Sequence, residues 1–360
     1  MNSKNPLVSL VIAAYNNPEY TRKTLQSIVD QDYRPIDVFL SDDCSPVSLK
    51  PLADEFKCFE NDLFIIRYFR QEHNLAGADN MTFCFDNAIG KYVVQMPHDD
   101  WFTDNSFLSQ AVELMEKNPE CYLCAANSIL EGTGEPVLKI PPQVCVGGEW
   151  TVLSGDTYVK IFGMDKIGHQ AWSGLVFNTA VARSLGAFHY PFNLSKDEAA
   201  KIGLLADEGF AFQYLLSSVG DVALTAKVIS VRGRPAQAFC NQNAKVWSSM
   251  VGQVLFVLYF NIYKAKLTGR YAKAVRNRAK NAIFHYPAER FNLKIIKHYK
   301  YDSEAIFLMI LACISRRWLD IKNQFKYLVS VWKFYQDLFK KEGLRAVFKR
   351  LLRRPAGFSQ

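Results

Sequence analysis

The sequence predicts an α/β fold in which helices flank a mostly parallel central sheet, followed by a helical C-terminal extension. Strand-like and helix-like segments alternate through the first two thirds of the chain. The 360 residues are 49% hydrophobic and 22% charged, which is enough apolar material for one sizeable core and a smaller second unit. From about Trp247 onward, aromatic and basic residues recur at helical spacing and strand signals stop. We therefore expect two domains, 1–245 and a basic, mainly helical region at 246–360.

The first hundred residues alternate regularly between the two kinds of segment. Apolar runs of strand length predict strands at 9–15, 36–42, 63–69 and 91–96. Helical periodicity predicts helices at 21–31, 50–59 and 80–89. Strands that alternate with helices form parallel βαβ units, so these segments define the parallel part of the sheet.

The pattern is more mixed in the second part of the α/β domain. It predicts helices at 106–117, 156–162, 181–186 and 207–220, and strands at 122–130, 172–178 and 222–232. Residues 131–150 are rich in Gly and Pro and are predicted to be irregular. The last of these strands is expected to close the domain.

Charge is distributed unevenly along the chain. The formal net charge is +8, yet residues 261–354 hold 23 Lys or Arg against 6 Asp or Glu. Such a basic, aromatic-rich region is suited to an anionic membrane surface. The alternative is a helical bundle that packs on the α/β domain or self-associates into a homo-oligomer. Nucleic acid is not an expected partner, because no nucleic-acid-binding motif accompanies the charge.

Neither the apolar runs nor the cysteines indicate a membrane span or an oxidising compartment. The longest later runs, 254–260 and 305–314, are shorter than the ~20 residues of a spanning helix. The eight cysteines are scattered, and Cys121 and Cys124 lie in a strand-like segment without a second ligand pair for zinc. We expect reduced cysteines and a cytoplasmic protein, peripheral on the inner face of the cell membrane.

Two adjacent carboxylates follow the strand at 91–96. Asp99 and Asp100 come just after Pro97, at the carboxyl end of that strand, where open α/β sheets bind ligands. Such a pair suits Mg²⁺ or Mn²⁺, which fills its other positions from water and phosphate oxygens. Capping of the following helix is an equally good explanation of the pair taken alone.

Four segments in order carry a resemblance to a known family: SLVIAAYNN, VFLSDDCSP, GKYVVQMPHDDW and DEGFAFQYLL. Over residues 6–240 the chain resembles the family 2 inverting glycosyltransferases, which have the Rossmann-like GT-A fold. The resemblance implies a UDP- or dTDP-sugar donor and a divalent metal.

The resemblance assigns the nucleotide pocket to the ends of the first two strands. Ala13, Tyr15 and Asn16 match the family's base pocket, with Tyr15 able to stack on a pyrimidine ring. Asp43 matches the acceptor of the base NH, and Asp42 supports its loop. The alternatives are a core tyrosine and an ordinary turn aspartate.

The resemblance also divides the acids between donor, metal and base. Asp99 matches the ribose and sugar contact and Asp100 the metal ligand, while His98 replaces a more usual acidic or small residue. Glu208 is the expected base, with Asp207 as runner-up, because an acceptor hydroxyl must lose its proton as it attacks. Both could instead be first-turn acids that complement a helix dipole.

One departure from the family concerns the diphosphate. Asp79 stands where many relatives carry an arginine, so Arg232 and Arg234 are the candidates to stabilise the leaving group, with solvated surface arginines as the alternative. His169 and Trp172 match the acceptor side, although Trp172 equally suits a protein core.

The sequence thus predicts an inverting, metal-dependent glycosyltransferase acting on a glycan or lipid-linked acceptor in cell-surface polysaccharide synthesis. Two alternatives remain open. A nucleotidyltransferase would need a glycine-rich, lysine-bearing loop after the first strand, and AAYNNPEY is not one. A non-catalytic, membrane-associated scaffold would retain the nucleotide fold without turnover.

Overall fold

The computed structural model describes residues 5–161, 172–187, 208–235, 262–264 and 267–283. Within them, nine strands form one mixed sheet in the order β3-β2-β1-β4-β8-β6-β9-β5, with β7 paired to β9. The parallel pairings are the long ones, while each antiparallel pairing spans two or three residue pairs. The predicted α/β class is therefore confirmed.

The N-terminal half is a run of parallel βαβ units. Its elements are β1 (Val8–Ala14), α1 (Pro18–Val29), β2 (Ile36–Asp42), α2 (Lys50–Phe56), β3 (Phe64–Arg70), α3 (Ala76–Asp86) and β4 (Tyr92–Gln95). Nearly every residue of β1 and all of β2 are buried, because helices cover both faces of this part of the sheet. Helix α3 begins four residues before the predicted start.

The second half adds shorter, partly antiparallel strands. Its strands are β5 (Asp100–Phe102), β6 (Cys121–Leu130), β7 (Thr151–Leu153), β8 (Leu175–Asn178) and β9 (Asp221–Arg232). Its α-helices are α4 (Phe107–Lys117), α5 (Gly155–Ile161), α6 (Thr179–Ser184), α8 (Glu208–Val219) and α11 (Ala272–Ile283). Strands β5 and β7 were not predicted, since each is only three residues long.

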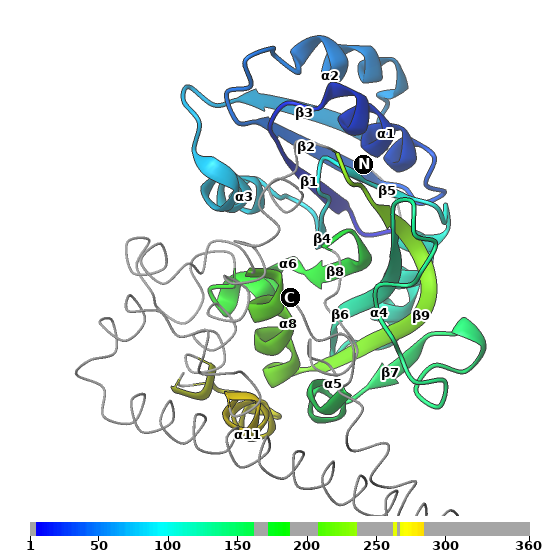
Figure 1. Cartoon of the computed structure of the whole chain (residues 1–360), viewed down its shortest axis with the longest axis vertical. Helices are drawn as coiled ribbons and strands as arrows, with labels where there is room; N and C mark the ends of the chain where they lie inside the picture. Colours follow the sequence, from blue (N-terminus) through cyan, green and yellow to red (C-terminus); the bar gives the residue numbers. More distant parts are fainter. Residues whose placement is uncertain (1–4, 162–171, 188–207, 236–261, 265–266, 284–360) are drawn as a thin grey trace, which may run out of the picture.

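Helices lie on both faces of the sheet (Figure 1), and the buried side chains form two hydrophobic clusters, one on each face. One cluster joins the sheet to α1, α2 and α4. The other joins it to α3, α5, α6, α8 and α11. Burial on both faces is what holds the strand ends, and the side chains that follow them, in fixed positions.

Helix α11 packs directly against the α/β domain. Val275 and Ala279 are fully buried in the same cluster as residues of α5 and α8. Gly155 allows this contact, because a Cβ there would lie 1.9 Å from the Ser217 carbonyl oxygen and 2.7 Å from the Tyr271 ring. The predicted boundary near residue 245 lies outside the described residues. Among the helices that the structure describes, none combines the length and apolarity needed to cross a membrane.

Candidate active site

The turn after β1 opens the candidate site. Asn16 and Asn17 both have φ 57°, a left-handed conformation that Asn tolerates better than most residues, and Pro18 then begins α1. This turn leaves Tyr15 43% exposed, so part of its ring is open to solvent rather than in the core. Ala13, on β1, is half-buried and pairs with Ser41 of β2.

Asp42, at the end of β2, is a structural carboxylate. Its oxygens accept hydrogen bonds from the Ser45 amide at 2.9 Å and the Leu49 amide at 3.0 Å, and Arg70 Nη1 lies 2.7 Å away. Burial raises the pKa of Asp42, but these hydrogen bonds outweigh burial and leave that pKa lowered. Asp42 therefore supports the loop, as expected.

Asp43 lies where the loops after β1, β2 and β3 meet. Its amide donates to the Ala14 carbonyl at 2.8 Å, and its Oδ1 accepts from the Leu75 amide at 2.7 Å. The side chain is almost fully buried, and this burial raises the pKa of Asp43 although the Leu75 and Ala76 amides oppose the rise. The carboxylate is thus held beside the Tyr15 turn.

The acidic pair is more enclosed than the sequence indicated. Asp100 was expected just beyond the carboxyl end of the strand at 91–96, but it is 4% exposed and begins a strand of its own, β5, which pairs antiparallel with the end of β9. This long-range pairing places Asp100 directly opposite Arg232. Helix capping is excluded, because α4 begins only at Phe107, after Ser106 at its N-cap.

Asp99 and Asp100 together concentrate negative charge around the buried Asp100 carboxylate. Its oxygens accept from Ser173 Oγ at 2.9 Å and from the Gly233 amide at 3.2 Å. Burial, followed by the charge of Asp99, raises the pKa of Asp100 to about 7, against the opposing charge of Arg232. Asp99 is half-buried. Two adjacent carboxylates with this charge excess fit a hard divalent cation that completes its shell with phosphate oxygens.

Helix α1 ties the acidic pair to the Tyr15 turn. Thr24 Oγ1 lies 3.0 Å from the His98 carbonyl oxygen and 2.7 Å from that of Asp100. Asn17 Nδ2 lies 3.3 Å from His98 Nε2. His98 therefore lies between the turn after β1 and the loop that carries the acidic pair.

The end of β9 carries two arginines, of which Arg232 acts on the charge of Asp100. Arg232 is half-buried at the last position of β9, and Arg234 is exposed two residues later. Between them, a Cβ at Gly233 would lie 1.9 Å from the Asp99 carbonyl oxygen, so only glycine permits this approach.

Glu131 and Tyr20 hold this arginine loop, and sequence reasoning missed both. Glu131 Oε2 accepts from Tyr20 Oη at 2.9 Å and from the Arg234 amide at 2.9 Å. The Glu131 amide also donates to the Arg232 carbonyl at 2.9 Å. No local signal marks these residues, because their partners are more than a hundred positions apart and Glu131 opens the segment predicted to be irregular.

The structure describes only some of the remaining predicted site residues. The half-buried Trp172 ring packs against Phe85, Phe177 and Phe212, with centroids 5.2–6.1 Å apart, which agrees with a core role. Asp79 lies in the first turn of α3. Glu208 begins α8, but the structure does not describe its side chain. Asp207 and His169 lie outside the described residues altogether.

The family of this domain is shown by comparison of sequences. Residues 9–179 match the sequence profile of Glycosyl transferase family 2. This span runs from β1 through β8 and contains Tyr15, Asp43, Asp99 and Asp100. Residues 9–179 are therefore a family 2 glycosyltransferase domain.

Individual relatives are distant. The chain is 25% identical over 140 residues to a putative teichuronic acid biosynthesis glycosyltransferase, TuaG, of Bacillus subtilis, a match that covers 39% of this chain and 54% of TuaG. It is 24% identical over 132 residues to the putative glycosyltransferase EpsH of the same organism, covering 37% of each. The match thus spans about half of TuaG and about a third of EpsH.

The fold has solved counterparts. The crystal structure of S. aureus TarS 1–349 in complex with UDP-GlcNAc superposes with a TM-score of 0.53 at 15% identity, covering 85% of this chain and 79% of that one. This similarity establishes the GT-A fold.

Proposed function

We propose that this protein is an inverting glycosyltransferase that moves a sugar from a UDP- or dTDP-sugar to a hydroxyl of a glycan or lipid-linked acceptor. The observation that carries the proposal is the convergence of Tyr15, Asp43, the Asp99–Asp100 pair and Arg232 at one edge of the sheet. The family of the domain and the names of its relatives support a role in cell-surface polysaccharide synthesis.

The nucleotide would occupy the turn after β1. The open Tyr15 ring would stack on the pyrimidine, with Ala13 and Asn16 beside it. The buried Asp43 would accept the imide N–H of the base, a donor that uracil and thymine have and cytosine lacks. This requirement is the reason for preferring a UDP- or dTDP-sugar.

The diphosphate would lie between the acidic pair and the arginine loop. Asp100 would hold Mg²⁺ or Mn²⁺, and Asp99 would contact the ribose and the sugar. The ion, when bound, neutralises charge on the leaving diphosphate. Arg232 and Arg234 would add cations from the end of β9, in place of the arginine that Asp79 replaces.

The transfer itself needs a base opposite the leaving group. Glu208, or Asp207 beside it, would take the proton of the acceptor hydroxyl as its oxygen forms the new bond to the anomeric carbon. The bond from that carbon to the diphosphate oxygen breaks in the same step, which inverts the configuration and releases the nucleoside diphosphate. His169 would lie on the acceptor side, and the half-buried Trp172 would border that side while most of its ring packs in the core.

The basic C-terminal region would bring the catalytic domain to the place where the reaction occurs. With 1–245 as the catalytic domain, residues 246–360 would hold the protein on the inner, anionic face of the cell membrane, near a lipid-linked acceptor. Packing or self-association of this region is the alternative.

A screen of nucleotide sugars tests the proposal. The purified chain is assayed with Mn²⁺ or Mg²⁺ for a thermal shift with UDP, dTDP and their sugars, and then for release of the nucleoside diphosphate. Nucleotide binding followed by acceptor-stimulated release is expected. Binding without turnover would favour the scaffold, and pyrophosphate release from a nucleoside triphosphate would favour the nucleotidyltransferase.

The Tyr15→Ala variant is expected to weaken UDP binding. Loss of the stacked ring removes about 1 kcal/mol, or roughly a fivefold rise in Kd. Calorimetric titration with UDP measures it. Tyr15→Phe keeps the ring and serves as the matched control, and equal affinities for the Ala variant and the natural protein would place the base elsewhere.

The Glu131→Ala variant is expected to lower kcat/KM by about tenfold, because the arginine loop loses its anchor. Glu131→Gln keeps an oxygen that accepts the same two hydrogen bonds and is expected to retain activity. Initial rates over a range of donor concentrations, together with Tm, separate this effect from unfolding. A Glu131→Ala enzyme with normal kinetics would show that the loop needs no such anchor.

A further inference from the structure

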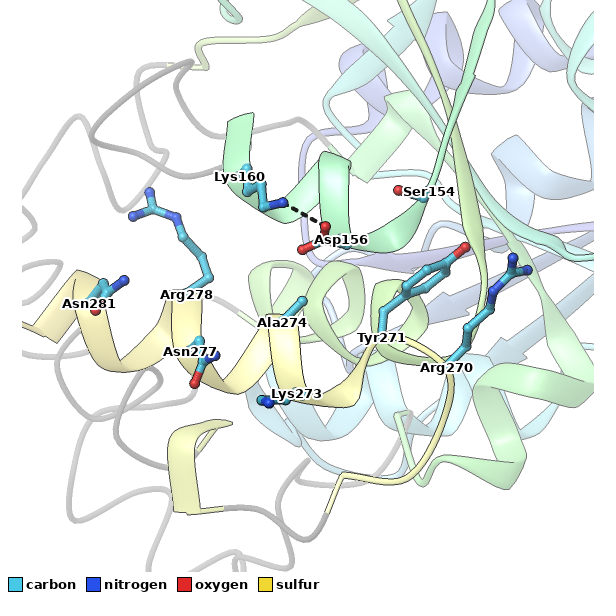
Figure 2. Close-up of a pocket in the computed structure, with 10 residues that line it drawn as sticks. All are labelled: Ser154, Asp156, Lys160, Arg270, Tyr271, Lys273, Ala274, Asn277, Arg278 and Asn281. Atoms are coloured by element: carbon cyan, nitrogen blue, oxygen red, sulfur yellow. Dashed lines mark hydrogen bonds and ion pairs between the residues drawn. The ribbon is translucent and has the colours of Figure 1, made fainter.

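A groove between α5 and α11 lies apart from the candidate active site. Its volume is about 610 Å³, within the range of small-ligand sites. Figure 2 shows α5 residues on one side and residues of α11, with the two that precede it, on the other. Ten residues line it, among them Lys160, Arg270, Lys273, Asn277, Arg278 and Asn281.

The lining is strongly cationic. Four of the ten residues are Lys or Arg and one is acidic. Lys160 pairs with Asp156 at 2.6 Å and Arg270 pairs with Glu120 at 2.7 Å, but the two basic side chains are 64% and 62% exposed, so both pairs are weak. The exposed Lys273 has no ion-pair partner within the part of the chain that the structure describes. An incoming anion can therefore meet Lys273 directly and can compete with Glu120 for Arg270.

The walls of the groove are fixed by hydrogen bonds to the rest of the α/β domain. Tyr271 donates its hydroxyl to Asp221 Oδ1 at 2.8 Å and its amide to the Ser218 carbonyl at 2.9 Å. Arg278 Nε donates to the Val159 carbonyl at 3.1 Å, which ties α11 to the last turn of α5. The cations are thus presented by helices already locked to the core, and binding costs little reorganisation.

The position of the groove separates it from the donor site. Tyr271 bonds to Asp221 at the start of β9, whereas Arg232 stands at the other end of the same strand. The strand between them corresponds to roughly 35 Å at ~3.3 Å per residue. The groove is therefore distinct from the place proposed for the donor diphosphate.

We propose that this groove binds a phosphoryl-bearing anion. Phosphate oxygens match Arg and Lys cations, and the Asn277 and Asn281 amides, four residues apart on α11, add uncharged donors to the lining. The same chemistry is offered by a phospholipid headgroup and by a free phosphate compound. The proposal does not depend on the function proposed above.

Two experiments on the full chain test this proposal. Titration with inorganic pyrophosphate detects binding of a free phosphate compound, and sedimentation with vesicles detects binding of a phospholipid headgroup. Vesicles of phosphatidylcholine alone are compared with vesicles that also contain phosphatidylglycerol. Lys273→Glu is expected to weaken binding of the pyrophosphate or of the anionic vesicles by about tenfold. Lys280→Glu makes the same charge change on α11 outside the groove and is expected to change binding less than about twofold.

Each result bears on the proposal. Pyrophosphate binding that depends on Lys273 assigns a free phosphate compound, and vesicle binding that depends on Lys273 assigns a lipid headgroup. Equal losses in Lys273→Glu and Lys280→Glu would mean a diffuse charge effect and would overturn the proposal, as would the absence of both kinds of binding. Arg232→Ala changes only the proposed donor site and is expected to leave binding of the anion in the groove unchanged. A failure of the donor-site proposal can therefore be told apart from a failure of this one.

Discussion

The Asp100→Asn variant is expected to lose transfer activity while it gains thermal stability. The amide keeps the size of the side chain but removes the charge that would hold the metal, so kcat is expected to fall by about 10²–10³-fold. Initial rates with saturating Mn²⁺ measure the loss. A nucleotide-induced thermal shift that no longer depends on the metal would trace the loss to the ion.

The gain in stability follows from the burial of Asp100. Its pKa is raised to about 7 in the folded chain, so without metal the folded state becomes less stable as pH rises from about 4 to about 7, because the buried group must ionise. Asn has no such transition. In chelator at pH 8, we expect a higher Tm for Asp100→Asn than for the natural protein. A lower Tm together with intact metal-dependent turnover would remove Asp100 from the metal site.

Ser173→Ala is the matched control for this site. Ser173 donates to Asp100 Oδ2 from a fully buried position and also lies 3.0 Å from Ser230 Oγ. Removing its hydroxyl leaves the charge of Asp100 in place. Turnover is therefore expected to persist, with the metal concentration needed for half-maximal rate altered by only a few-fold.

The Glu208→Gln variant is expected to lower kcat by about 10²–10⁴-fold with little change in donor affinity. Glutamine has a similar shape but cannot take a proton from the acceptor hydroxyl. Transfer rates measure the loss, and calorimetric titration with UDP shows that the nucleotide still binds. Binding that is preserved without turnover is the signature of a missing base.

Asp207→Asn separates the two candidates for that role. If Glu208 is the base, the Asp207 variant is expected to lose far less activity. The reverse order would assign Asp207 instead, and normal turnover in both variants would mean that these acids only complement the dipole of α8. Donor hydrolysis in the absence of acceptor serves as an internal check on the integrity of the site.

Local patterns in the sequence were sufficient for the parallel strands β1 to β4 and for the loops that follow them. The ends of β1, β2 and β4 carry Tyr15, Asp43 and the acidic pair because parallel strands end at the same edge of a sheet. Periodicity predicts the strands, and topology then brings their loops together. This is why distant motifs were expected to form one site.

Features set by long-range pairing were not predictable in the same way. Strand β5 exists because Asp100 to Phe102 pair with Arg232 to Ser230, and this pairing turns an expected loop into a buried strand. Glu131 likewise gains its role only when its carboxylate meets Tyr20 and the Arg234 amide. Helix α3 begins early, at Ala76, whose left-handed conformation no periodic signal marks.

Helix α1 has a further consequence for the motions of the site. Asn17 precedes it, Tyr20 and Thr24 lie on it, and these residues contact the turn after β1, the acidic pair and the Glu131 anchor. A local opening of this helix would release all three loops together, so they share one free energy of opening. A ligand that holds any one of these loops is therefore expected to slow hydrogen exchange of the backbone amides in the others.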